Sequence, residues 1–80
     1  MPTTVERVIR CMTDVFKNKG LRPPALSSTT RLAPELGLDS LDYAELIIRL
    51  ETEFGRDPLQ DGQLPELKTI ADLAKLYEQR

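Results

Sequence analysis

Apolar side chains recur with helical spacing in three stretches of this chain. The first stretch, at about residues 4–19, places apolar residues at i, i+3, i+4 and i+7, the pattern of a helix with one buried face. Thr3 and Glu6 have the spacing of a capping box at its start, and Gly20 stands where a left-handed C-cap belongs. The stripe comprises Val5, Val8, Ile9, Met12, Val15 and Phe16.

A second helix is expected from Ser40 or Leu41 to Phe54. Its apolar residues form a stripe wide enough to face two neighbours, which is what the central helix of a bundle requires. The stripe comprises Tyr43, Ile47, Leu50 and Phe54, widened by Leu41, Ala44 and Ile48. The opposite, polar side is expected to hold Asp42, Glu45, Arg49 and Glu53.

A third helix is expected to begin at Thr69, which has Asp72 at capping-box spacing. Its inner face comprises Ile70, Leu73, Ala74 and Tyr77. The pattern contains no period-two strand and no internal repeat. We therefore predict a single all-α domain over residues 1–80, a small bundle of three principal helices.

The two connections differ in character. Residues 20–38 form a long first loop, which Pro23-Pro24 keep from being helical. A connection of this length is unusual unless it packs on the domain or serves function, and its leucines predict packing. Those leucines are Leu26, Leu32, Leu36 and Leu38. Residues 56–68 are rich in turn formers, with room for one short helical turn between Leu64 and Leu67.

Composition excludes several classes of function. The 80 residues include one cysteine and no histidine, so an internal disulfide, a zinc site and a Ser-His-Asp hydrolase are all excluded. Cys11 is interpreted as a small packing residue. No apolar run is as long as a membrane span, and the N-terminal residues lack the apolar core of a signal peptide. We expect a cytoplasmic monomer that is not an enzyme.

Charge is distributed unevenly along the chain. Residues 1–22 carry five basic and two acidic side chains, whereas residues 35–57 carry seven acidic and two basic ones. No basic stripe suits a phosphate backbone, so nucleic acid is not an expected partner. The acidic stretch predicts protein partners with basic docking surfaces.

Ser40 lies near the start of this acidic stretch, and its position has two possible interpretations. A serine before an apolar-periodic run is most simply an N-cap, and the acidic face would then belong to a non-covalent protein-interaction module. A helix N-terminus also favours a phosphate, because its free N–H groups and its dipole attract anions. The position therefore permits a phosphodiester on Ser40 without identifying one.

Residues 36–41 read Leu-Gly-Leu-Asp-Ser-Leu, and with them the chain resembles the acyl carrier protein family along almost its whole length. The acidic run over 42–55 looks like the family's second helix, and residues 69–73 look like the start of its last helix. The resemblance implies that a phosphopantetheinyl transferase attaches 4′-phosphopantetheine from coenzyme A to Ser40. The thiol of this arm would hold acyl groups, partly sheltered between the helices, for acyl-transferring or condensing enzymes.

The resemblance also implies where partners dock and which kind of carrier this is. Docking is expected on the second helix, at Asp39, Leu41, Asp42 and Glu45, of which Asp42 and Glu45 are taken to face solvent. Arg49 interrupts this acidic face, and Arg56 and Pro58 make the following loop less acidic than is usual in the family. These departures favour a carrier dedicated to one lipid, polyketide or related pathway, with Arg49 selecting the partner, over the general carrier of fatty acid synthesis.

Overall fold

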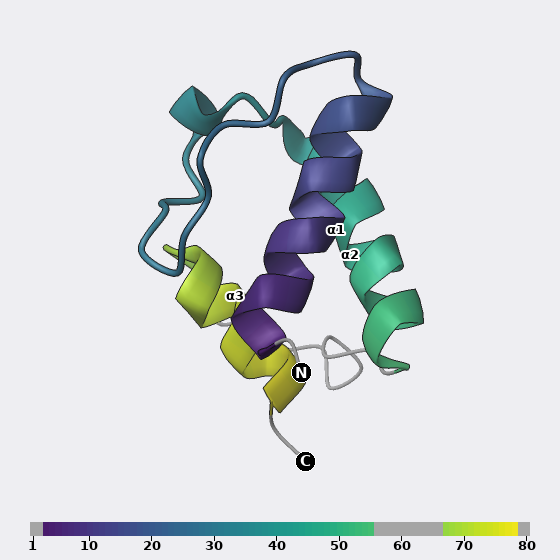
Figure 1. Ribbon diagram of the computed structural model, residues 1–80, viewed down its shortest axis with the longest axis vertical. Coiled ribbons are helices and arrows are strands. Elements are labelled where there is room, and N and C mark those ends of the chain that lie inside the picture. The colour runs from purple at the N-terminus through teal and green to yellow at the C-terminus, as the bar shows by residue number, and fades with distance from the viewer. Residues whose placement is uncertain (1–2, 56–66, 79–80) are drawn as a thin grey trace.

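Three α-helices form the body of the molecule, a computed structural model that describes residues 3–55 and 67–78. They are α1 (Thr4–Asn18), α2 (Ser40–Phe54) and α3 (Ile70–Glu78), with a short 3-10 helix η1 (Pro34–Leu36) in the first connection. Both α2 and α3 pack on α1, which lies between them in Figure 1. The described ranges contain no strand beyond an isolated bridge between Arg31 and Thr69, so the predicted all-α fold is confirmed.

The ends of α1 follow from its local sequence. The Thr3 hydroxyl accepts a hydrogen bond from the N–H of Glu6 at 3.1 Å, and the Glu6 carboxylate accepts one from the N–H of Thr3 at 3.2 Å. This is the predicted capping box. At the other end, Gly20 adopts φ 78°, and the N–H of Leu21 donates to the carbonyl of Phe16 at 3.0 Å. The left-handed glycine thus ends the helix as predicted.

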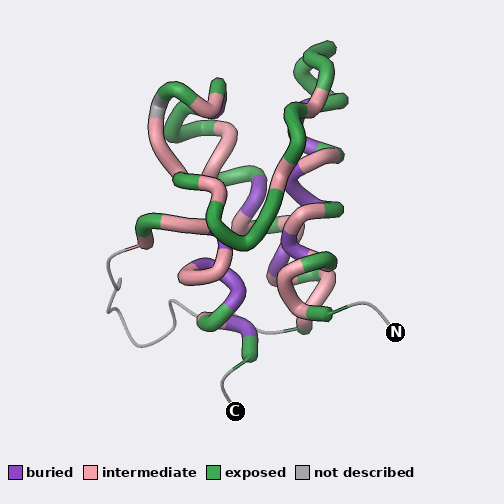
Figure 2. Tube along the Cα trace, turned by 60° about the vertical axis from the view of Figure 1, so that its left-hand side comes forward, coloured by how far each residue is buried: buried purple, intermediate pink, exposed green. Residues whose placement is uncertain are grey.

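The core is built mainly from α1 and α3. Most of the stripe predicted on α1 is buried, with Val5 and Ile9 partly buried at its edges. Cys11 is 7% exposed, and burial raises the pKa of its thiol, so the predicted packing role is confirmed. Exposed and buried residues alternate along each helix in Figure 2, as expected where one side packs. The buried residues of α3 are those predicted: Ile70, Leu73, Ala74 and Tyr77.

The apolar stripe of α2 differs from the prediction. Leu41 is 79% exposed and Ile48 is 62% exposed, and Ala44 is also exposed, so the expected widening of the stripe is wrong. Leu46, which the predicted stripe left out, is fully buried beside Leu50. The reason is that α2 packs through one side only, so residues on its opposite side meet no neighbour within the described residues.

Charged contacts join α1 and α2 near both ends. Arg7 donates to the Glu53 carboxylate at 2.7 Å and to the Glu53 backbone carbonyl at 2.9 Å. Lys19 donates to the Asp42 carboxylate at 2.5 Å. Because α1 begins at the Arg7 end and α2 begins at the Asp42 end, the two helices run antiparallel (Figure 1). Such partly exposed pairs contribute modestly to stability, and they join α2 to α1 near both ends.

The long first connection is tied to the start of α3. The N–H of Leu32 donates to the carbonyl of Lys68 at 2.8 Å, and the N–H of Ile70 donates to the carbonyl of Thr30 at 3.0 Å. Leu26, Leu32 and Leu36 pack partly buried against the core, so the predicted packing of this connection is confirmed. The short turn predicted between residues 64 and 67 lies, except for Leu67, outside the described residues.

Candidate functional site

Ser40 is the first residue of α2, but it is not the N-cap. Asp39 takes that place, because its carboxylate accepts a hydrogen bond from the N–H of Asp42 at 2.9 Å. The Asp42 carboxylate in turn accepts one from the N–H of Asp39 at 3.0 Å. The interpretation of Ser40 as a capping residue is therefore wrong, and its hydroxyl is not needed to start the helix.

The Ser40 hydroxyl is free at the start of α2. The side chain is exposed, and its hydroxyl makes no hydrogen bond within residues 3–55 and 67–78. The N–H groups of Ser40 and Leu41 also lack an acceptor among these residues, because the cap serves Asp42. Free N–H groups and the helix dipole favour an anion at this point. The site thus fits a phosphodiester on Ser40.

Gly37 makes the turn that presents this serine. Its φ of 105° is one that a residue with a side chain rarely adopts. A Cβ atom added there would lie 3.6 Å from Cε1 of Phe16, so the barrier to substitution is the backbone conformation and not a clash. The chain then buries Leu38, which is 3% exposed, and delivers Asp39 to its capping position. The glycine and leucine of the motif position the serine.

Asp42 is held against the end of α1. The prediction that it faces solvent is therefore wrong. Its side chain is 15% exposed and pairs with Lys19, whose Nζ also lies 3.4 Å from the carbonyl oxygen of Gly37. The hydrogen bond from Lys19, followed by that from the backbone of Asp39, lowers the pKa of Asp42 below its ordinary value of 3.8. Lys19 thus links the end of α1 to the loop and helix that carry Ser40.

The lowered pKa of Asp42 predicts a pH-dependent stability. The ionised carboxylate is favoured by folding, so its contribution is fully present above pH 3.8 and is lost as the pH falls through the lower pKa of the folded state. We expect Asp42→Asn to be less stable than the wild type at neutral pH, with the difference shrinking in acid. Thermal unfolding of both proteins, from neutral pH down to below pH 3.8, measures this difference in stability. A difference independent of pH, or one that is undiminished in a Lys19→Met background, would contradict the role of the pair.

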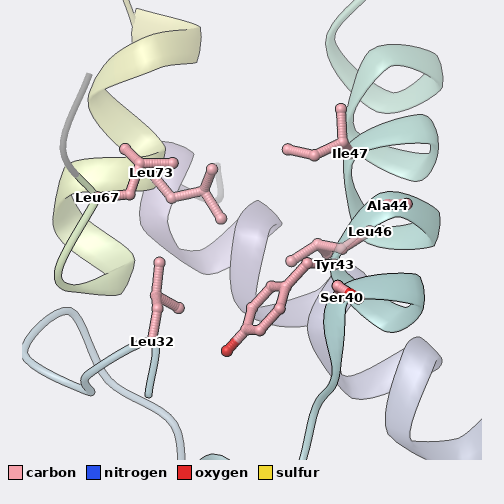
Figure 3. Close-up of a pocket in the computed structure, with 8 residues that line it drawn as sticks. All are labelled: Leu32, Ser40, Tyr43, Ala44, Leu46, Ile47, Leu67 and Leu73. Atoms are coloured by element: carbon pink, nitrogen blue, oxygen red, sulfur yellow. The ribbon is translucent and has the colours of Figure 1, made fainter. Parts of the chain in front are cut away.

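A cavity opens beside Ser40. It has a volume of about 350 Å³ and lies between α2 and α3, with one wall from the first connection (Figure 3). Its lining comprises Leu32, Ser40, Tyr43, Ala44, Leu46, Ile47, Leu67 and Leu73. A second hollow of about 520 Å³ shares Leu32, Ser40 and Tyr43 with the first and extends to Lys19. Ser40 therefore borders both spaces, and an apolar chain attached there can enter the first.

The exposed side of α2 forms a second feature of the site. We call it the outer face of α2; it consists of Leu41, Ala44, Glu45, Ile48 and Thr52. Of the residues predicted for docking, Leu41 and Glu45 lie on this face, Asp39 is exposed at the cap, and Asp42 is turned toward α1. Arg49 borders the outer face and donates to the Glu45 carboxylate at 3.3 Å.

Sequence reasoning missed Ile48 on the outer face. Its spacing of i+7 from Leu41 was the available signal, because residues seven apart lie on the same side of a helix. The prediction instead counted both residues as part of the buried stripe. An exposed leucine and isoleucine two turns apart, flanked by Glu45, make a partly apolar and partly charged surface next to Ser40.

Other kinds of site are not found in the described part of the chain. Residues 3–55 and 67–78 contain no group of three or more potential metal ligands. None of the helices described here is both long and apolar enough to cross a membrane.

Comparisons with known proteins point to one family. Residues 6–77 match the family model described as phosphopantetheine attachment site. An acyl carrier protein from Rickettsia bellii (strain RML369-C) is 31% identical over 74 residues, which cover 92% of this chain and 81% of the relative. One from Afipia carboxidovorans is 33% identical over 64 residues, 80% of each chain.

A solved structure agrees with these relatives. The solution structure of MacpD from Pseudomonas fluorescens, an acyl carrier protein involved in mupirocin biosynthesis, superposes with a TM-score of 0.80 at 36% identity. The match covers 95% of this chain and 68% of that one.

Proposed function

The chain belongs to the acyl carrier protein family, and we propose that Ser40 is the attachment point of its covalent 4′-phosphopantetheine. The observation that carries this proposal is the position of the serine. Ser40 has a free, exposed hydroxyl at the first residue of α2, and it borders the cavity between α2 and α3. No other feature described above joins a free hydroxyl, a helix N-terminus and an apolar cavity.

The chain's own residues hold the arm and shelter its cargo. The arm, when attached, supplies a thiol that carries acyl groups as thioesters. Ser40 acts as an anchor and not as a nucleophile during turnover, which agrees with carriers being substrates of enzymes and not catalysts themselves. The apolar lining of the cavity favours an acyl chain by about 0.8 kcal/mol for each methylene it buries.

The attachment is tested by intact mass. The purified chain is incubated with coenzyme A, magnesium and a phosphopantetheinyl transferase, and the product is digested to locate the added group. The proposal expects one phosphopantetheine per chain, on the peptide that contains Ser40. A chain that gains no arm, or that gains it on another residue, would contradict it.

We propose that partner enzymes dock on the outer face of α2. Leu41 and Ile48 offer exposed apolar area, and Glu45 adds a negative charge within two turns of Ser40. A partner seated there has its active site within reach of an arm on Ser40. Asp39 contributes charge at the cap, whereas Asp42 acts through its pair with Lys19. Exposed charges of this kind set the encounter rate and orientation more than affinity.

Charge changes on the Glu45–Arg49 pair are expected to have opposite effects on loading. Glu45→Lys removes the acid and should slow loading by a transferase with a basic docking surface by about twofold to tenfold. Arg49→Glu should speed the same reaction, since it adds to the acidic face. The initial rate of arm transfer measures both effects.

Asp14→Lys is the matched control, because it makes the same change in charge on the exposed side of α1. It should leave the rate near the wild-type value. Added salt should shrink the differences, since screening acts over about 10 Å at 0.1 M. Equal rates for all four proteins at low salt would show that this face carries no docking function.

We further propose that this carrier serves a dedicated pathway. Arg49 partly neutralises the acidic face through its contact with Glu45, so a native partner offers an acidic group opposite it. The similarity to a mupirocin carrier at 36% identity supports secondary metabolism, such as polyketide assembly, over general fatty acid synthesis. Arg49→Glu should then slow loading by the native acyl-transferring enzyme, while it speeds loading by an enzyme of general fatty acid synthesis.

A further inference from the structure

The hydroxyl of Tyr43 is a buried polar group in the wall of a largely apolar cavity. Its oxygen is buried and has no hydrogen-bond partner among the described residues. The side chain leaves α2 one turn after Ser40, and its ring reaches across the cavity toward Leu32 (Figure 3). Apart from Ser40, the remaining described side chains of the lining end in carbon: Leu32, Ala44, Leu46, Ile47, Leu67 and Leu73.

An unpaired hydroxyl in this place costs free energy. The tyrosine has given up its hydrogen bonds to water without gaining others, whereas phenylalanine would fill the same space without that loss. Buried polar groups in folded proteins nearly always have hydrogen-bond partners. We therefore expect the Tyr43 hydroxyl to form a hydrogen bond in another state of the molecule. Burial, with a smaller effect of the Asp42 carboxylate, raises the pKa of Tyr43 above 10.0. The group therefore stays protonated at neutral pH and can both donate and accept.

The position of the hydroxyl indicates what that partner is. Ser40 and Tyr43 both border the two hollows beside α2, so Tyr43 lies at the end of the cavity nearest the anchor. An acyl chain that enters from this end passes the Tyr43 side chain, whose ring runs from α2 toward Leu32 (Figure 3). Ile47 and Leu73 line the cavity from opposite sides, so the space for a hydrocarbon tail is between them (Figure 3).

We propose that Tyr43 selects acyl groups that bear an oxygen, as a hydroxyl or a keto group, a few carbons from the thioester. This inference rests on the proposed function of Ser40. The hydroxyl donates to a keto oxygen or exchanges a hydrogen bond with a hydroxyl, and so both groups are satisfied in the apolar cavity. A saturated chain of equal length buries its methylenes as well but leaves Tyr43 unpaired.

The test compares three acyl groups on the same protein. Wild type and Tyr43→Phe are loaded by a transferase from octanoyl, 3-oxo-octanoyl and 3-hydroxyoctanoyl coenzyme A, and thermal unfolding is followed after intact mass has verified loading. In the wild type we expect the two oxygen-bearing groups to raise Tm about 4–8 °C more than octanoyl does. In Tyr43→Phe this preference should vanish, while the octanoyl form is at least as stable as that of the wild type.

Ile47→Val is the matched control, because it removes one methyl group from the same cavity. It should lower the stabilisation by all three acyl groups equally and keep the preference for oxygen. Equal Tm shifts for the three acyl groups in the loaded wild type, or a preference that persists in Tyr43→Phe, would overturn the role of Tyr43. Either result would leave the proposed function of Ser40 standing. A chain that gains no arm would overturn this role and the proposed function together.

Discussion

Ser40→Ala is expected to abolish attachment of the phosphopantetheine arm while leaving the fold intact. The hydroxyl is the proposed attachment atom, and nothing else in the described structure depends on it, since Asp39 caps the helix. Exposed positions without such a role change stability by less than about 0.5 kcal/mol. For a domain of this size, that is a change in Tm of less than about 4 °C. Intact mass and thermal unfolding measure the two outcomes.

Asp39→Ala is the matched control at the neighbouring position. It removes the N-cap and should cost about 0.5–2 kcal/mol of stability. Because the serine remains, the variant should still take one arm per chain, although more slowly if Asp39 contributes to docking. The two variants therefore separate loading from stability. An arm found on Ser40→Ala would show that another residue is modified.

Leu46→Ala is expected to destabilise the domain strongly. Leu46 is fully buried, and such substitutions usually cost about 2–5 kcal/mol, part of it from the cavity left behind. A domain of 80 residues has a total stability of about 4–12 kcal/mol, so the loss is a large share of it. Chemical unfolding should show a markedly lower midpoint with little change in slope.

Ile48→Ala, only two residues away, should behave in the opposite way. The side chain is 62% exposed, so its loss should change stability by less than about 0.5 kcal/mol. Its place on the outer face of α2 predicts slower arm transfer instead. If Ile48→Ala lost as much stability as Leu46→Ala, the orientation of α2 described here would be wrong. If it loaded at the wild-type rate, Ile48 would have no part in docking.

The boundaries of α1 and α2 could be predicted because their signals are local. A capping box, a run of helix-forming residues and a terminal glycine act over one or two turns. In both helices, the groups that form these signals come from the same short segment. The start of α2 shows the limit of this reasoning. Asp39 and Ser40 are both good N-caps, and the sequence alone does not decide between them. The turn at Gly37 does, because it places the Asp39 carboxylate next to the N–H of Asp42.

The side of α2 that faces the core could not be predicted in the same way. Apolar residues occur almost all around this helix, so several stripes fit the helical period equally well. The choice depends on α1, which holds α2 through Arg7 and Lys19, residues far away in sequence. In this orientation of α2, Leu46 is buried, whereas Leu41 and Ile48 are exposed.

The sequence by itself determined the helical class, the family and Ser40 as the residue to test, because these depend on short motifs and on periodicity within one segment. Only the tertiary structure decided that Asp42 is paired, that the outer face of α2 is partly apolar, and that Tyr43 stands unpaired in a cavity. Each of these depends on residues from two or three elements meeting in space. Packing of α2 and α3 on α1, with the first connection bonded to α3, creates surroundings that no single segment encodes.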